Sequence, residues 1–271
     1  MHSLSIVWDP PMGIEIGSIM IRYYSLMFVL AFSIGFYLMK KIFIEDKLDL
    51  EKLDSLFVWV IVSTILGARL GHVFFYDWAY FQNHLLEILL PVRFEPEFEF
   101  IGFRGLASHG AAIGIIAALY FYSKNILKKP LLFLIDRLGI MVALAGFFIR
   151  IGNLMNSEIV GKPTGTDYGF IFVQLGEDFP RYPTQLYEAF SYLAIFMLLW
   201  YLYWKTDLKK RQGYLFGLFF ALLWTVRFVV EFFKEAQVDD RAAWSLNTGQ
   251  WLSIPLVLIG LYCMYRSKES K

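Results

Sequence analysis

Seven blocks of about twenty mostly apolar residues recur along this chain of 271 residues, and they restrict its fold more than any other feature. A helix needs about twenty apolar residues to cross roughly 30 Å of hydrocarbon. Only 18% of the residues are charged, whereas about a quarter are charged in a soluble domain. The sequence therefore predicts an all-α polytopic membrane protein, one domain over residues 1–271, with seven transmembrane helices at about 19–39, 54–75, 106–123, 131–150, 185–204, 213–233 and 249–265.

Basic residues predict the orientation of these helices. The connections after the first, third and fifth blocks, together with the C-terminus, hold 14 of the 25 Lys and Arg residues. By the positive-inside rule they face the cytoplasm, so an odd number of spans places the N-terminus outside. The first residues lack the basic start of a signal peptide. Cys263 is the only cysteine, which excludes an intrachain disulfide.

Two longer connections lie on the predicted outer side. Residues 76–105 are aromatic and partly apolar but are interrupted by charge and proline. They are interpreted either as an arm lying on the outer leaflet or as an ordinary loop with membrane-belt aromatics. Residues 151–184 form the second outer segment.

Polar side chains that are costly in a membrane gather in the outer half of the predicted helices. The segment after the fourth block is the densest, because an arginine, two asparagines and a glutamate follow each other within a few turns. The whole set comprises Arg22, Tyr24, Arg69, His109, Arg150, Asn153, Asn156, Glu158, Gln185, Tyr187, Glu188, Arg227 and Glu231.

Three arginines of this set lie at a similar depth. Left without partners, Arg69, Arg150 and Arg227 would together cost roughly 8–10 kcal/mol, at about 2.5–3.5 kcal/mol each. The glutamates relieve part of this cost, and Arg227 and Glu231 share a helix face because they are four residues apart. One interpretation is that such pairs only hold helices together. The other is a desolvated outer cavity for a phosphate, which a guanidinium binds in bidentate fashion.

His109 also has two interpretations. It is either a hydrogen-bonding residue of the helix interior or a proton acceptor beside a reacting group, since histidine changes its charge near neutral pH. The glycine pairs at 110 and 114, and at 67 and 71, have the spacing that allows another helix to approach closely.

These residues alone leave three function classes open: an enzyme acting on lipids, an outward-facing anion or lipid transporter, and a structural membrane scaffold. Alternating-access transport favours inverted repeats and helices broken at the midplane, and the sequence has neither. The sequence also lacks metal-ligand spacings, a catalytic serine motif and a glycine-rich phosphate loop, so we expect no metal and no cofactor. A net charge of +1 gives no basis for nucleic-acid binding.

The segment GFFIRIGNLMNSEIVGKPT, residues 146–164, closely resembles the signature of bacterial prolipoprotein diacylglyceryl transferases. Further segments resemble the family in the same order along nearly the whole chain. They are YYSLMF (23–28), LGARLGHVFFY (66–76), SHGAAIG (108–114), RYPTQLYEA (181–189), RFVVEFFK (227–234) and GQWLSIP (249–255).

The resemblance implies a multi-pass enzyme of the bacterial inner membrane, with seven spans and a periplasmic N-terminus and active site. This family transfers the sn-1,2-diacylglyceryl group of phosphatidylglycerol to the lipobox cysteine thiol of a prolipoprotein signal peptide. Glycerol-1-phosphate is released in this first step of lipoprotein maturation. Arginines would stabilise the charge growing on the leaving phosphate, and a base near neutral pH would activate the thiol.

The resemblance also assigns residues. His109, Arg150 and Arg227 match the catalytic positions, with both arginines on the lipid phosphate and His109 on the thiol. Further positions for binding phosphatidylglycerol match Tyr24, Asn153, Glu158, Gly161 and Glu231, and possible supporting residues are Arg69, Asn156, Gln185 and Glu188.

The sequence departs from the family pattern at two of these segments. Leu223 stands where some members have a functional tyrosine, four residues before Arg227, and Tyr182 stands where a histidine is frequent. Either neither the hydroxyl nor the imidazole is indispensable at these positions, or a neighbour such as Trp224 substitutes. The segment 151–184 is also shorter than in some relatives.

Overall fold

The computed structural model describes residues 4–17, 19–90, 92–94, 97–100, 105–235 and 246–269. Most of them are helical. The longer helices are α1 (Tyr23–Glu45), α2 (Leu50–Tyr76), α4 (Ser108–Tyr122), α5 (Leu131–Met155), α6 (Thr184–Lys205), α7 (Tyr214–Val230) and α8 (Thr248–Arg266). Short turns of helix are α3 (Trp78–Phe81), η1 (Leu85–Ile88), η2 (Ser123–Leu127), η3 (Val173–Leu175) and η4 (Asp207–Lys210).

Six helices are long and apolar enough to cross a membrane: α1, α2, α4 continued through η2, α5, α6 and α8. The sixth predicted span, at about 213–233, corresponds to α7, which is apolar but has only 17 residues. The first predicted span begins too early, because residues 19–22 form a strand and α1 begins at Tyr23. The fourth ends too early, because α5 continues to Met155 and so includes Arg150 and Asn153.

Short strands, which were not predicted from the sequence, lie before the first helix, in connections between helices and after the last helix. β1 (Leu4–Trp8) pairs in parallel with β6 (Tyr168–Phe172), and β2 (Gly13–Ile16) pairs antiparallel with β3 (Ile19–Arg22). Two smaller antiparallel pairs join β4 (Val92–Arg93) to β5 (Glu99–Phe100) and β7 (Arg211–Gln212) to β8 (Lys268–Glu269). Each pair is two-stranded, so the strands fasten chain segments to each other rather than form a core sheet.

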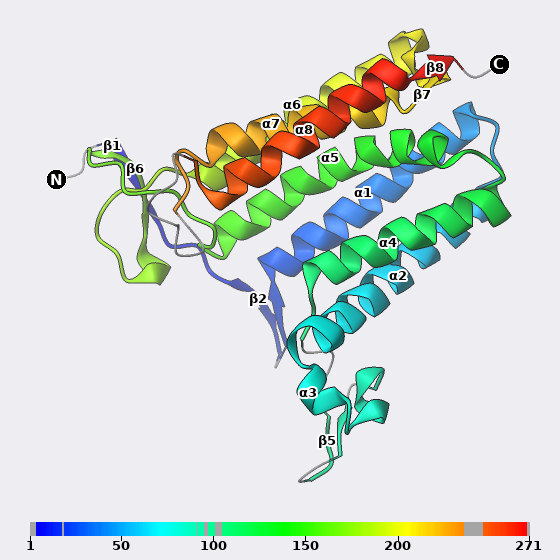
Figure 1. Cartoon of the computed structure of the whole chain (residues 1–271). Coiled ribbons are helices and arrows are strands. Elements are labelled where there is room, and N and C mark those ends of the chain that lie inside the picture. The colour runs from blue at the N-terminus through cyan, green and yellow to red at the C-terminus, as the bar shows by residue number, and fades with distance from the viewer. Residues whose placement is uncertain are drawn as a thin grey trace. The chain divides into compact units, whose positions relative to one another are not determined.

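The chain divides into two compact units, of which the larger comprises residues 1–39 and 135–271. In Figure 1 its helices α5, α6, α7 and α8 lie together, with β1 and β6 at one end and β7 and β8 at the other. Helices α7 and α8 touch through small residues, since a Cβ added to Gly217 would lie 2.6 Å from the Gly260 carbonyl oxygen. At the β1–β6 end, Leu154, Val160 and Phe172 form a small buried cluster.

The smaller unit comprises residues 40–134 and is built on the contact between α2 and α4. The two glycine pairs singled out in the sequence face each other there. A Cβ on Gly67 would lie 2.5 Å from the Gly110 carbonyl oxygen, and one on Gly114 would lie 3.0 Å from the Cα of Gly67. The prediction of close helix approach is therefore confirmed, and each pair is the partner of the other. The described residues of the segment 76–105, which is called the arm below, include α3, η1 and the paired strands β4 and β5.

Candidate active site

Arg150 lies near the end of α5 and contacts two side chains. Its Nε atom lies 2.7 Å from Oε2 of Glu188, a residue of α6 whose side chain is only 1% exposed. Its Nη1 donates a hydrogen bond of 3.1 Å to Oδ1 of Asn153, one turn further along α5. A buried ion pair needs such additional hydrogen bonds to offset the loss of hydration. Arg150 is thus held in one place by two helices.

Glu158 folds back onto the end of the same helix. The chain reverses after α5 because Ser157 and Ile159 adopt positive φ angles of 51° and 58°, and the Glu158 N–H donates to the Asn153 carbonyl at 3.0 Å. Its Oε1 then accepts hydrogen bonds from Nδ2 of Asn153 at 2.9 Å and of Asn156 at 3.5 Å. Arg150, Asn153 and Glu158 therefore form one continuous chain of charge-assisted hydrogen bonds.

Two further predicted residues join this chain of contacts. Gln185, which is fully buried at the start of α6, donates from Nε2 to the Glu158 carbonyl oxygen at 2.9 Å. Tyr24, at the start of α1, packs its ring against Gly152, where an added Cβ would lie 2.9 Å from the ring. The Tyr24 side chain also interacts with Asn153 and lies near the charges of Glu158 and Arg150. The signature segment therefore folds into one cluster with residues from α1 and α6.

Lys234 forms a second group of charges with Glu188 and Glu231. Its Nζ atom lies 3.9 Å from Oε1 of Glu188 and 3.9 Å from Oε2 of Glu231. Burial lowers the pKa of the Lys234 ammonium, and the charges of Arg150 and Arg227 act in the same direction, against the two glutamates. Glu188 thus has a cation on each carboxylate oxygen, which links the Arg150 cluster to the residues that end α7.

Arg227 differs from Arg150 in its surroundings. Its guanidinium carbon lies 5.4 Å from the centre of the Trp224 ring, a cation–π contact one turn back on α7. Among the residues that the structure describes, the Arg227 guanidinium has no ion pair or hydrogen bond. The Nε1 donor of Trp224 is buried and likewise has no acceptor among them. This part of the site therefore holds a cation and a hydrogen-bond donor that the described protein atoms do not satisfy.

Gly161 lies where three chain segments meet. An added Cβ would lie 2.3 Å from the Tyr182 carbonyl oxygen and 2.9 Å from that of Phe233, closer than any side chain can approach. Its own carbonyl accepts a hydrogen bond of 3.0 Å from Nη1 of Arg181, which also binds the carboxylate of Glu177 through Nε and Nη2. Glycine is thus required here for backbone packing, which brings the outer segment against the end of α7.

The remaining predicted site residues are His109 and Arg69. They lie in the smaller unit, whereas the arginine cluster belongs to the larger unit. His109 is exposed in the first turn of α4, with its ring centre 5.3 Å from that of Phe75 and 5.5 Å from that of Tyr76. His109 is thus next to aromatic rings of α2 and is not enclosed in the described part of its unit.

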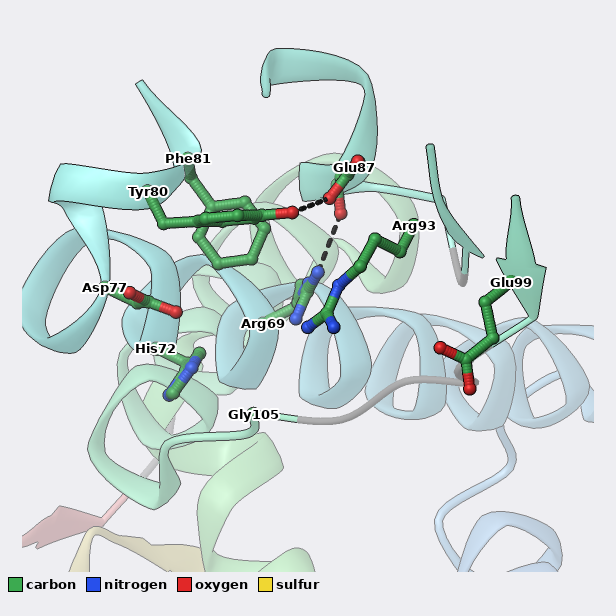
Figure 2. Close-up of a pocket in the computed structure, with 9 residues that line it drawn as sticks. All are labelled: Arg69, His72, Asp77, Tyr80, Phe81, Glu87, Arg93, Glu99 and Gly105. Atoms are coloured by element: carbon green, nitrogen blue, oxygen red, sulfur yellow. Dashed lines mark hydrogen bonds between the residues drawn. The ribbon is translucent and has the colours of Figure 1, made fainter. Parts of the chain in front are cut away.

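Arg69 is buried and binds the backbone of the arm. Its Nε and Nη2 atoms donate to the carbonyl oxygens of Ile88 and Glu87 at 2.8 and 2.7 Å, and its guanidinium lies over the Phe81 ring. Figure 2 shows Arg69 and Arg93 pointing into a cavity of about 230 Å³, with the Glu87 side chain beside them. These contacts make Arg69 an anchor between α2 and the arm.

The Glu87 carboxylate completes this anchor. It accepts hydrogen bonds from the Tyr80 hydroxyl at 2.6 Å and from the Phe94 N–H at 2.8 Å. Burial alone would raise the pKa of Glu87, but these hydrogen bonds outweigh burial and hold the pKa below its ordinary value. Within the described ranges, no group of three or more His, Cys, Asp or Glu residues could hold a metal ion.

Comparison with known proteins decides the family. The model of the prolipoprotein diacylglyceryl transferase family matches residues 11–266. The chain belongs to the prolipoprotein diacylglyceryl transferase family. It is 40% identical over 265 residues to a protein of Bacteroides fragilis, covering 97% of this chain and 95% of the relative. It is 41% identical to one of Chloroherpeton thalassium (97% and 94% covered) and 40% identical to one of Tolumonas auensis (98% and 99%). Each relative is named phosphatidylglycerol–prolipoprotein diacylglyceryl transferase.

Two residues in contact with the candidate site, Lys234 and Arg181, were not singled out in the sequence. Lys234 could have been found, because positions 227, 231 and 234 in RFVVEFFK recur at the spacing of one helix face. Arg181 gave no such signal, since its partners Glu177, Gly161 and Glu235 lie in a loop and beyond α7. The structure shows where the two residues that depart from the family pattern lie, and nothing in it explains the replacements. Tyr182 packs against Phe233, and the partly buried Leu223 precedes Trp224, whose donor is unsatisfied.

Proposed function

We propose that this chain transfers the sn-1,2-diacylglyceryl group of phosphatidylglycerol to the lipobox cysteine of a prolipoprotein signal peptide and releases glycerol-1-phosphate. The observation that carries the proposal is the similarity of nearly the whole chain, at about 40% identity, to relatives named for this reaction. This similarity identifies the protein as a transferase of lipoprotein biosynthesis. The lipid and the peptide are its two substrates.

The reaction makes an S–C bond and breaks a C–O bond. The cysteine thiolate attacks the glyceryl carbon that carries the phosphate, the electron pair of the C–O bond leaves with glycerol-1-phosphate, and the thiol proton goes to a base. Negative charge grows on the phosphate during this step, so fixed cations near it lower the barrier. Among the described residues the Arg227 guanidinium contacts the Trp224 ring but no anion, which supports its assignment to the leaving phosphate.

Arg150 is also assigned to the phosphate, but its guanidinium is held in place by protein side chains. Its Nε is held by Glu188 and its Nη1 by Asn153, so its remaining N–H groups have a fixed direction. A guanidinium held in this way loses little freedom when it binds a phosphate oxygen. We assign Arg150 to orienting the phosphate and Arg227 to the charge that develops on it. Lys234 adds a third cation behind Glu188.

The glycerol head group suits the uncharged side of the cluster. Tyr24 and Asn153 lie on this side, and Oδ1 of Asn156 is buried without a donor among the described residues. A hydroxyl of phosphatidylglycerol can donate to this oxygen, whereas Glu158 keeps the amides of Asn153 and Asn156 in place. These features support selection of a hydroxylated head group, and the cations disfavour a lipid that carries an ammonium.

His109 is assigned to the thiol. Only the thiolate is strongly nucleophilic, and a free cysteine has a pKa of about 8.5, so a base that works near neutral pH increases the reactive fraction. An exposed imidazole in the first turn of α4 is accessible to a peptide. The resemblance of the segment SHGAAIG (108–114) to the family supports this assignment.

The proposed topology has seven spans, a periplasmic N-terminus and a cytoplasmic C-terminus in the inner membrane, as one membrane domain. The pairing of β7 with β8 supports counting α7 as a span. Two paired strands lie on the same side of a membrane, and α8 crosses once between them, so α7 supplies the second crossing. Similarly, four long helices, α1, α2, α4 and α5, separate the paired strands β1 and β6.

The test is direct transfer by the purified protein. Incubation with phosphatidylglycerol vesicles and a lipobox peptide should increase the peptide mass by one diacylglyceryl group and release glycerol-1-phosphate. A peptide with serine in place of cysteine and vesicles of phosphatidylethanolamine are the controls. No mass increase with active-site residues intact, or equal transfer from phosphatidylethanolamine, would contradict the proposal.

A further inference from the structure

Asp136 is a buried carboxylate at the opposite end of the larger unit from the arginine cluster. It lies in the second turn of α5 and is 1% exposed. Its Oδ2 accepts a hydrogen bond of 2.7 Å from the Gly213 N–H, and its Oδ1 accepts one of 2.8 Å from the Phe216 N–H. Both donors belong to the start of α7, so one side chain of α5 holds the first turn of another helix.

The start of α7 lacks a cap of its own. Gly213, the residue before the helix, has no side chain and adopts a φ of 86°, a conformation that suits glycine. The first N–H groups of a helix need an acceptor, which a serine or aspartate at this position usually supplies. Asp136 supplies it from α5, and its charge also suits the positive end of the α7 dipole. The cap therefore doubles as a connection between two helices.

The connection between Asp136 and α7 also bears on the other ends of the two helices, where Arg150 and Arg227 lie. Arg150 follows Asp136 by 14 residues on α5, and Arg227 follows Gly213 by 14 residues on α7. In Figure 1 both helices run from the end with β7 and β8 toward the end with β1 and β6. Equal steps of about 21 Å along two helices of the same direction bring the two arginines to similar depth.

We propose that Asp136 is a positioning residue for the transfer reaction, because it sets the position of α7 along α5 and thereby the depth of Arg227 relative to Arg150. The proposal rests on the function proposed above for these arginines. The contacts of α7 with α8 through Gly217 and Gly260 hold α7 to α8, whereas the carboxylate ties it to α5. A slip of one residue moves a side chain by about 1.5 Å, and errors of about 1 Å can cost 100-fold in rate.

The experiment measures helix position and catalysis in the same protein. Spin labels are placed on Val142 of α5 and Val229 of α7, both 50% exposed, in a Cys263→Ala background. These positions are offset by about 15 Å along the helices, so a slip changes the distance between the labels. Asp136→Asn keeps the volume of the side chain but replaces one carboxylate oxygen by an NH₂ group. This group is a donor, so it cannot accept a hydrogen bond from an N–H group at the start of α7. Asp207→Asn is the matched control. Asp207 lies in η4, shortly before α7, and is exposed and paired with Lys210.

The expected result is specific to Asp136. In Asp136→Asn the label distance should shift by about 1.5 Å or broaden, and kcat should fall 10- to 100-fold with the peptide KM within twofold. Asp207→Asn should change neither quantity. If Asp136→Asn does not accumulate in the membrane, Asp136→Glu carries the test. It keeps both acceptors on a longer side chain and should give a smaller shift and a smaller loss.

Three results would overturn the proposal. They are an unchanged distance with reduced kcat, a changed distance with full activity, and equal effects of the two asparagine substitutions. The distance measurement does not depend on activity. Absence of transfer by the unlabelled wild-type protein would therefore refute the proposed function, while the label distance would still report on the connection between α5 and α7.

Discussion

Arg150 and Arg227 carry the same charge, but the structure gives them different neighbours. Arg150 is tied to Glu188 and Asn153, whereas Arg227 has only the face of Trp224 among the described residues. A cation that the protein leaves unpaired is available to a ligand, and one held by two partners is pre-oriented for it. This difference predicts that the two arginines fail in different ways when they are changed.

Lysine at either position keeps the charge but loses the planar fork of donors. We expect Arg227→Lys to lower the transfer rate about 100-fold or more, the size of effect that removal of one charge-stabilising donor has in other enzymes. Arg150→Lys should also lower protein stability, because the buried Glu188 carboxylate loses its ion pair with the Arg150 guanidinium. Transfer assays at equal membrane levels, with thermal unfolding, separate the two. Full activity of Arg227→Lys would contradict its assignment to the leaving phosphate.

The assignment of His109 gives a pH dependence. His109→Gln should lower turnover at pH 7 while phosphatidylglycerol binding persists. Raising the pH to about 9 passes the thiol pKa of about 8.5 and forms thiolate without a base, so part of the loss should return. The lysine variants of the arginines should show no such recovery, because their defect is in the leaving group. Identical pH–rate profiles in all three variants would reject this division of roles.

Gly161 is predicted to tolerate no side chain. In Gly161→Ala the added Cβ would meet the carbonyl oxygens of Tyr182 and Phe233, so the outer segment must move. We expect transfer activity and thermal stability to fall together. Gly35→Ala is the control, since a Cβ there meets nothing within 4 Å and alanine favours a helix by about 1 kcal/mol. Normal activity of Gly161→Ala would show that the segment adapts.

At the scale of elements, the arm depends on a small number of hydrogen bonds to α2. Arg69 binds two arm carbonyls, and Glu87 joins α3, η1 and β4 through Tyr80 and Phe94. The lowered pKa of Glu87 means that the folded arm favours the carboxylate. Its contribution to stability is therefore complete above the unfolded pKa of about 4.3 and is lost as the pH falls through the folded pKa.

This linkage predicts that the arm loosens in acid. Limited proteolysis between residues 76 and 105 should be slow at pH 7 and should accelerate below about pH 4. Glu87→Gln should be cleaved faster at pH 7 and should lose most of this pH dependence. Glu97→Gln, a change of an exposed arm residue, is the matched control and should behave like the wild type. Equal cleavage of the two variants at pH 7 would exclude Glu87 as the residue that holds the arm.

The elements show what a sequence can predict and what it cannot. Six helices of the described residues overlap their predicted blocks, because apolar length is a local property, whereas bounds such as the ends of α1 and α5 were predicted less well. Strand β1 was not predicted, since its five residues gain stability only by pairing with residues more than 160 positions away. The glycine pairs were recognised as contact surfaces, but their mutual pairing depends on how α2 and α4 pack. Arg69 was predicted as a possible supporting residue, and the arm carbonyls that it binds carry no sequence signal.

At the scale of the whole molecule, the function proposed for the arginine cluster requires one orientation of the protein in the membrane. Glu158, Gln185 and Lys234 lie in one connected group at the ends of α5, α6 and α7, so these ends face the same side. The basic residues at 209–211 and 266 belong to the opposite ends. The proposed active site faces the periplasm only if those opposite ends face the cytoplasm.

Reporter fusions test this orientation. A reporter fused after Lys271 should behave as cytoplasmic, and one inserted near Asp239, outside the described residues, should behave as external. The positive-inside rule gives this orientation, and the pairing of β7 with β8 supports placing the two reporters on opposite sides of the membrane. A fusion after Lys128 is the internal control and should report as the Lys271 fusion does. The opposite pattern would place the arginine cluster in the cytoplasmic leaflet and reject the mechanism.

The parallel pairing of β1 with β6 also has a consequence for how the protein is made. Leu4 pairs with Tyr168, so the first strand leaves the ribosome long before its partner exists. At about 5–20 residues per second, synthesis of the intervening chain takes roughly 10–30 s, and four long helices enter the membrane in that time. The N-terminal strand has to remain free and unaggregated during this interval. We therefore expect an affinity tag ahead of Leu4 to interfere with assembly at a late stage, when β1 pairs with β6, and a tag at the C-terminus to avoid that step.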